Sequence, residues 1–128
     1  MARAFPSAVL AFALTLPGQA LSAELVMMEQ AGCAWCMRWD REIAPAYPRT
    51  AEGAIAPLRR VDIHGEWPQD LAGIAREPFT PTFVLVENGR EIGRLRGYAG
   101  DQFFWPMLDE LLSKLPQTQG DGEPAPQR

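Results

Sequence analysis

Two cysteines three positions apart, Cys33 and Cys36, follow a short apolar run at residues 25–28. Four consecutive large apolar residues are typical of a buried strand. After Cys33, the residues Cys36, Trp39 and Ile43 recur at the spacing of one face of an amphipathic helix. We therefore expect a strand to end, and a helix to begin, at the two cysteines.

This position determines the chemistry expected of the pair. The free N–H groups and the dipole of a helix N-terminus stabilise an anion, which favours a thiolate at Cys33. Cys36 lies one turn inside the helix, shielded but within bonding reach, and can resolve a mixed disulfide formed at Cys33. A structural crosslink is the alternative, but so short a loop contributes only about 2 kcal/mol. We predict a redox-active Cys33–Cys36 disulfide that needs no other cofactor.

Composition limits the other functions. The chain has 128 residues and a net charge of -4, so we expect one folded domain and no nucleic-acid partner. Two cysteines and one histidine exclude four-thiolate zinc sites and multi-histidine metal sites, and His64 is expected to be a solvated loop residue.

A metallochaperone is the alternative from another functional class. The two thiols could hold Cu(I) together with one of the methionines Met27, Met28 or Met37, because Cu(I) prefers soft sulfur ligands. Methionines on a buried strand are more often core residues. Copper titration of the reduced protein distinguishes this alternative from thiol-disulfide exchange.

The two ends differ in composition from the middle. Residues 1–23 combine one charge, an apolar run at 8–16 and small residues at the end, which indicates a cleavable secretory signal rather than a membrane anchor. Residues 116–128 contain three prolines, two glycines and no large apolar residue, and are predicted to be a disordered tail. The folded domain should span residues 24–115 and meet an oxidising compartment.

The middle of the chain alternates strands and helices. Three further strands are predicted, at residues 58–63, 82–86 and 91–96. A short amphipathic helix is expected from near Pro68 through Ala75, and Asn88-Gly89 indicates a hairpin between the last two strands. A final helix is expected to be capped by Asp101 and distorted by Pro106. The order β-α-β-α-β-β-α predicts a single α/β domain.

Two further features point to substrate binding. Pro81 stands at the start of a predicted central strand, where it lacks a donor for the sheet. A cis Thr80–Pro81 bond would turn the Thr80 backbone outward to pair with an extended substrate, whereas an ordinary trans proline is the alternative. Trp35, between the cysteines, should form an exposed contact surface with Tyr98, while Trp39 and Trp105 should be core residues.

In this order, the CxxC pair, Thr80-Pro81-Thr82 and the Asn88-Gly89 hairpin resemble the thioredoxin superfamily over most of residues 24–115. Several segments are also similar to the periplasmic thioredoxin-like proteins of bacterial sulfur-oxidation operons: residues 32–36, 42–45, 47–48, 52–53, 80–85 and 97–98. The resemblance implies a four-stranded mixed sheet flanked by helices. It also implies a periplasmic reductase that acts on protein thiols and disulfides and keeps the cysteine of a sulfur-carrier protein active. A membrane thiol transporter would supply the electrons.

The chain also departs from ordinary thioredoxins. Ala34 and Trp35 stand between the cysteines in place of Gly-Pro, so the redox potential is not carried over by the resemblance. Where thioredoxins bury an aspartate as a proton relay on the strand before the cysteines, this chain has Met27-Met28-Glu29. We expect Glu29 to be a solvated strand-end carboxylate, and the alternative is that it replaces the aspartate. A redox-silent adaptor is a further alternative, and it predicts a disulfide that does not exchange with glutathione.

Overall fold

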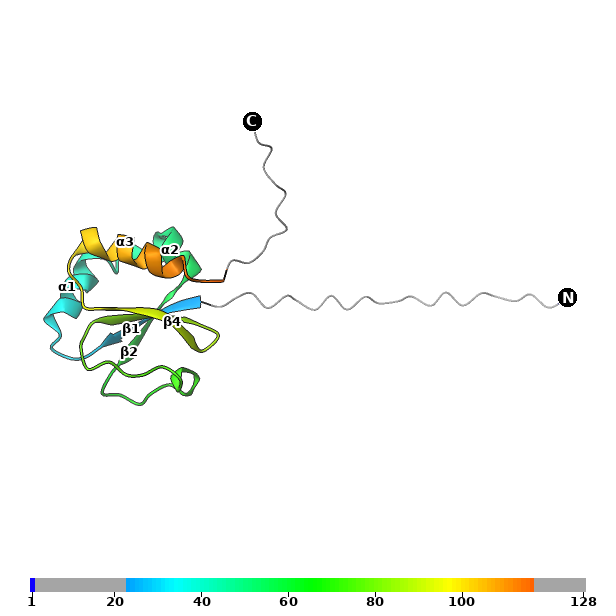
Figure 1. Ribbon diagram of the computed structural model, residues 1–128, viewed down its shortest axis with the longest axis horizontal. Coiled ribbons are helices and arrows are strands. Elements are labelled where there is room, and N and C mark those ends of the chain that lie inside the picture. Colours follow the sequence, from blue (N-terminus) through cyan, green and yellow to red (C-terminus); the bar gives the residue numbers. More distant parts are fainter. Residues whose placement is uncertain (2–22, 117–128) are drawn as a thin grey trace, which may run out of the picture.

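The computed structural model describes residue 1 and residues 23–116 (Figure 1). The predicted signal segment and tail lie outside the described residues, apart from Met1, Ala23 and Pro116. The described helices are α1 (Ala34–Glu42), α2 (Ala51–Ile55) and α3 (Asp101–Leu112), with 3-10 turns η1 (Tyr47–Arg49) and η2 (Gln69–Leu71). Among the described residues, no helix is both long enough and apolar enough to cross a membrane.

Four strands form one mixed sheet in the order β2-β1-β3-β4. The strands are β1 (Ala23–Glu29), β2 (Leu58–Asp62), β3 (Thr82–Glu87) and β4 (Arg90–Arg96). β1 and β2 are parallel and are joined through α1 and α2, whereas β3 pairs antiparallel with both β1 and β4. The sheet confirms the predicted α/β fold class.

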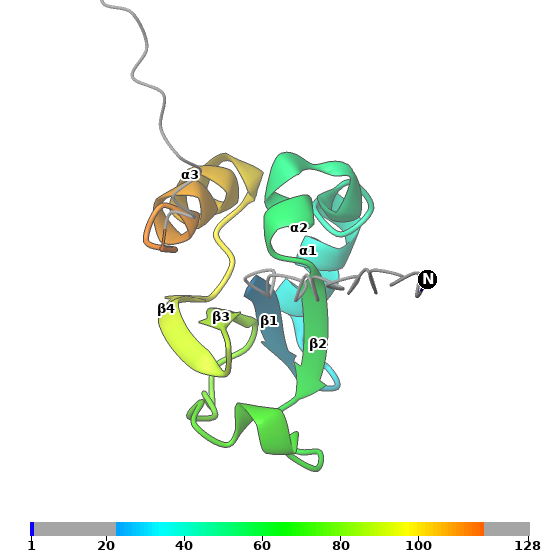
Figure 2. The same cartoon turned by 90° about the vertical axis from the view of Figure 1, so that its right-hand side faces the viewer.

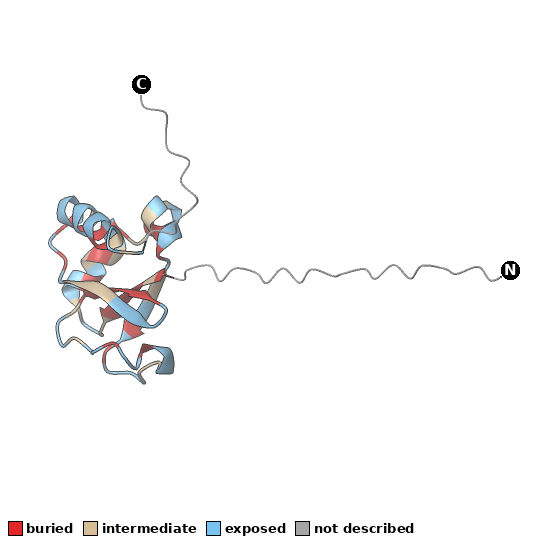
Figure 3. Ribbon diagram, turned by 45° about the vertical axis from the view of Figure 1, so that its right-hand side comes forward, coloured by how far each residue is buried: buried red, intermediate tan, exposed pale blue. Residues whose placement is uncertain are grey.

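Each face of the sheet carries its own core. Because side chains alternate along a strand, Leu25 and Met27 of β1 face the helices, while Val26 and Met28 face the other side. Figure 2 shows α1, α2 and α3 together on one face and the segment with η2 on the opposite face. The central strands β1 and β3 are largely buried, whereas the edge strands β2 and β4 are partly exposed, and Figure 3 shows the outward helix surfaces exposed.

Local sequence explains most of the elements. Asn88 and Gly89 adopt positive φ angles of 50° and 74°, as a tight hairpin turn requires, and they join β3 to β4 as predicted.

Helix α3 runs through Pro106 without a break. It begins after Gly100 rather than after Asp101, so the predicted cap is displaced by one residue. The Asp101 carboxylate instead accepts the Gln102 N–H at 2.8 Å.

Two elements differ from the prediction. The helix expected from Pro68 through Ala75 is only the single turn η2, because Gly73 lies two residues after its end and Pro78 restricts the chain further on. Leu71 and Ile74 are nevertheless buried in the core on that face. Helix α2 was not predicted, since it is five residues long and has an exposed isoleucine, Ile55, at its end.

Candidate active site

The strand register brings four loops together at one edge of the sheet. Parallel pairing sets Glu29 opposite Asp62, so the chain leaves β1 and β2 at the same edge. Antiparallel pairing sets Thr82, the first residue of β3, opposite both Met28 and Arg96. The residues that follow β1, β2 and β4 and those that precede β3 therefore meet there. This edge contains both cysteines.

The two cysteines form a disulfide at the start of α1. Their sulfur atoms are 2.11 Å apart and their Cα atoms 5.2 Å apart. Cys33 is the N-cap of α1, and its sulfur accepts the backbone N–H of Cys36 at 3.1 Å. This N–H points at Cys33 Sγ, where a reduced Cys33 would carry its negative charge. The predicted disulfide and its place at the strand-helix junction are confirmed.

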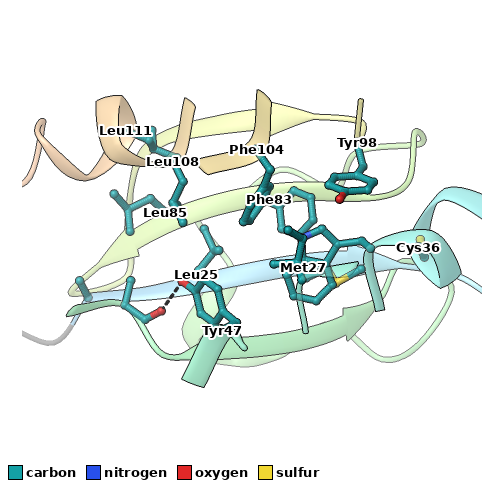
Figure 4. Close-up of a cluster of buried hydrophobic side chains, with 14 residues drawn as sticks. Leu25, Met27, Cys36, Tyr47, Phe83, Leu85, Tyr98, Phe104, Leu108 and Leu111 are labelled. Atoms are coloured by element: carbon teal, nitrogen blue, oxygen red, sulfur yellow. Dashed lines mark hydrogen bonds between the residues drawn. The ribbon is translucent and has the colours of Figure 1, made fainter. Parts of the chain in front are cut away.

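The two sulfur-bearing residues differ in their access to solvent. Cys33 is partly exposed, whereas Cys36 is 4% exposed and belongs to the core cluster between sheet and helices. Figure 4 shows Cys36 at one end of this cluster, at the opposite end from Leu85 and Leu111. A reagent or partner therefore reaches Cys33 before Cys36.

A group of four linked side chains lies beside the disulfide: Trp35, Arg38, Glu42 and Tyr98. Arg38 Nε donates to Glu42 Oε1 at 2.8 Å, and the Tyr98 hydroxyl donates to Glu42 Oε2 at 2.6 Å. The Arg38 guanidinium also lies 5.7 Å from the centroid of the Trp35 ring and 5.8 Å from that of Tyr98, within the range of a cation-π contact. The hydrogen bond from Arg38 lowers the pKa of Glu42, and the bond from Tyr98 lowers it further. Burial is the main cause that raises the pKa of Tyr98, and its hydrogen bond to Glu42 adds to this rise.

The predicted exposed surface of Trp35 and Tyr98 is therefore only half correct. Trp35 is 53% exposed, but Tyr98 is 6% exposed and packs edge-on against Phe104. Tyr98 is buried because its hydroxyl finds a carboxylate partner on α1, which removes the need for water. Trp39 is a core residue as predicted, and Trp105 is partly buried against the same cluster.

The Thr80–Pro81 peptide bond is cis, as expected, and lies at the same edge. Its loop is held on one side by the Gly97 N–H, which donates to the Pro81 carbonyl at 2.7 Å. Within the loop, Thr82 Oγ1 donates to the Phe79 carbonyl at 2.7 Å. The Phe79 side chain is 68% exposed and Thr80 is half-buried. Sequence reasoning missed Phe79, which no periodic pattern marks.

Gln30 connects this loop to the cysteine turn. Its side-chain Nε2 donates to Thr80 Oγ1 at 2.8 Å, and its backbone carbonyl accepts the Cys33 N–H at 3.3 Å. The remaining amide oxygen lies 2.8 Å from Nε2 of His64. An amide oxygen can only accept, so His64 donates this bond. Sequence reasoning did not single out Gln30, because a lone glutamine after a strand has no recognisable spacing.

Two arginines of β2 are paired with carboxylates. At the disulfide edge, Arg60 bonds Glu29 at 2.5 Å and Asp40 at 2.8 Å. Nearer the start of β1, Arg59 bonds Asp70 at 2.6 Å and Glu24 at 3.1 Å. The sequence predicted a solvated carboxylate at Glu29, but Glu29 is held in an ion pair with Arg60. Both arginines are engaged by carboxylates.

The methionines of the copper alternative do not converge. Met27 and Met28 are fully buried in the cores on opposite faces of the sheet, and Met37 is 56% exposed on α1. Among residues 1 and 23–116, no group of three or more His, Cys, Asp or Glu side chains is placed to hold a metal ion.

Solved structures provide the relatives of this chain. The periplasmic thioredoxin SoxS from Paracoccus pantotrophus, in its reduced form, is 48% identical, with a TM-score of 0.68 over 73% of this chain and 98% of that one. The chain belongs to the thioredoxin superfamily. It is a thiol-disulfide oxidoreductase, with Cys33 and Cys36 as its disulfide.

More distant thioredoxins share the fold. A thioredoxin from Thermus thermophilus is 22% identical with a TM-score of 0.56, over 73% of this chain and 75% of that one. One from Malassezia sympodialis is 19% identical with a TM-score of 0.52, over 71% and 76%. Neither a family model nor a curated protein sequence matches the chain.

Proposed function

We propose that this oxidoreductase works as a periplasmic reductase, with Cys33 as the nucleophile and Cys36 as the resolving thiol. The observation that carries the assignment of roles is the difference in access between a partly exposed Cys33 and a 4% exposed Cys36. A nucleophile must reach the disulfide of another protein, whereas a resolving thiol needs to reach only its neighbour.

The reaction conserves atoms and electrons in two exchanges. The Cys33 thiolate attacks one sulfur of a substrate disulfide, forming a mixed disulfide and releasing the other substrate sulfur as a thiolate. The Cys36 thiolate then attacks Cys33 Sγ, which forms the Cys33–Cys36 disulfide and releases the second substrate thiolate. The substrate gains two electrons and, in water, two protons. A dithiol donor restores the reduced pair by the same exchange in reverse.

The direction and location of this chemistry rest on similarity and on the N-terminal sequence. The relative that is 48% identical is a periplasmic thioredoxin, and residues 1–23 have the composition of an export signal. In an oxidising compartment a reductant needs a supply of electrons from the membrane, and a membrane thiol transporter is the proposed donor. The proposed substrate is the cysteine of a sulfur-carrier protein, which oxidation would otherwise block.

The surface around Cys33 suits a protein substrate. Trp35 and Phe79 expose 53% and 68% of their surface, and Thr80 stands half-buried beside the turn that carries Cys33. In our proposal, Trp35 supplies apolar contact and the Thr80–Pro81 loop pairs with the backbone of the substrate. Tyr98, which is buried, supports this surface from beneath through Glu42 and Arg38.

A trapping experiment tests the proposal. A Cys36→Ser variant cannot resolve its mixed disulfide, so proteins attacked by Cys33 accumulate as covalent adducts that mass spectrometry identifies. Among the adducts we expect a sulfur-carrier protein and a membrane thiol transporter. For the natural protein, with both cysteines, we expect a reduction potential of roughly -230 mV or lower. The Cys33→Ser variant is the matched control and should yield no such adducts. Adducts of newly secreted proteins, with a potential near roughly -120 mV, would instead indicate a disulfide donor.

A further inference from the structure

Gln30 connects three loops at the edge of the sheet that contains the two cysteines. It directly follows β1, its carbonyl accepts the Cys33 N–H, and its side chain bonds Thr80 and His64, each at 2.8 Å. Gln30 is half-buried, and both polar atoms of its side chain are satisfied by protein partners. A flexible glutamine is thereby held in one orientation.

The contacts of the Thr80–Pro81 loop show what Gln30 adds. The Gly97 N–H ties Pro81 to the end of β4, and the Thr82 hydroxyl closes the loop on itself at Phe79. Among the side-chain hydrogen bonds of the described residues, the Gln30–Thr80 bond is the one that joins this loop to the cysteine turn. The loop therefore has one anchor toward β4 and one toward Cys33.

We propose that Gln30 is a positioning residue that sets the Thr80–Pro81 loop at a fixed distance from Cys33 for exchange with protein disulfides. The proposal rests on the docking role of Thr80 described above. Gln30 itself touches no reacting atom, since its contact with Cys33 is through the backbone. Its side chain acts on the substrate only by holding Thr80.

This role predicts an effect that depends on the substrate. A protein disulfide has to align its backbone along the loop before its sulfur meets Cys33, so a loosened loop raises the KM. A small disulfide needs no such alignment, and its exchange rate depends on the cysteines alone. A residue that merely stabilised the fold would change neither rate selectively.

The test compares Gln30→Ala with Gln69→Ala, an identical change at an exposed glutamine in η2. Insulin serves as the protein disulfide and hydroxyethyl disulfide as the small one, with a dithiol as electron donor. We expect Gln30→Ala to raise the KM for insulin about fivefold, the change expected from one lost hydrogen bond. Its rate with hydroxyethyl disulfide should stay close to that of Gln69→Ala.

A double variant tests whether Gln30 acts through Thr80. Thr80→Val removes the hydroxyl that Gln30 holds, so adding Gln30→Ala should raise the KM for insulin no further. The proposal would be overturned if the two substitutions together raised the KM for insulin by the product of their separate effects. Equal KM values for Gln30→Ala and Gln69→Ala would also overturn it. A parallel loss with both disulfides would also overturn it. The proposed sulfur-carrier role is tested separately: if it is wrong, Cys36→Ser will form no adduct with a sulfur-carrier protein.

Discussion

Replacing Tyr47 with phenylalanine removes one buried hydrogen bond and no packing. The Tyr47 hydroxyl donates to the Ala56 carbonyl at 2.7 Å, and the two residues are 1% and 0% exposed. Ala56 ends helix α2, so its carbonyl has no partner within that helix. The aromatic ring remains in place in the variant and keeps its contacts with Trp39 and Trp105.

The cost follows from the burial of the acceptor. A buried carbonyl left without a donor costs about 1–3 kcal/mol, and water cannot easily reach Ala56 to compensate. We therefore expect Tyr47→Phe to lower the free energy of unfolding by about 2 kcal/mol. For a domain of this size the thermal midpoint should fall by roughly 10 °C.

The assay is urea unfolding of the oxidised protein, followed by tryptophan fluorescence. Tyr98→Phe is the matched control, because its hydroxyl bonds the carboxylate of the exposed Glu42 and water can replace that bond. We expect the control to lose less than half as much stability as Tyr47→Phe. Equal losses, or a loss at Tyr47 below about 0.5 kcal/mol, would refute the burial argument.

Two other substitutions give separate tests. Arg38 holds the pKa of Glu42 below its ordinary value, so this stabilisation is present above the unfolded-state pKa of about 4.3 and disappears as the pH falls through the folded-state value. Glu42→Gln should thus be less stable than the natural protein at neutral pH, and equal stability differences at neutral and acidic pH in urea unfolding would contradict this. In Gly53→Ala, the new Cβ would lie 1.9 Å from the Tyr47 carbonyl oxygen, and we expect a loss above about 2 kcal/mol. Gly65→Ala, whose nearest contact is 3.5 Å away, should change little in the same unfolding assay.

Features set by local pattern could be predicted from the sequence. The buried strand before the cysteines, the hairpin at Asn88-Gly89 and the strand after Pro81 each depend on a few adjacent residues, and all were found in the structure. Helix α2 depends instead on Thr50, whose hydroxyl accepts the Gly53 N–H at 3.0 Å, and on close contact with η1. Five residues are too few for a periodic signal to appear.

The site was only partly predictable, for a related reason. The roles proposed for Cys33 and Cys36 follow from their spacing and their place on a helix, which are local properties. The burial of Tyr98 depends on a bond to Glu42, 56 residues away, and the role proposed for Gln30 depends on a bond to Thr80, 50 residues away. Such pairs become neighbours only through the register of the sheet.

The convergence of the loops at one edge has a practical consequence for anything joined to this protein. β1 begins at the far edge of the sheet, seven residues or roughly 20 Å from its end near Cys33. α3 starts beside Tyr98 and runs away from the disulfide, so its last turn also lies toward the far edge (Figure 1). A label, a fused domain or a solid support attached at residue 23 or residue 116 would therefore leave the disulfide facing outward, toward a partner in solution.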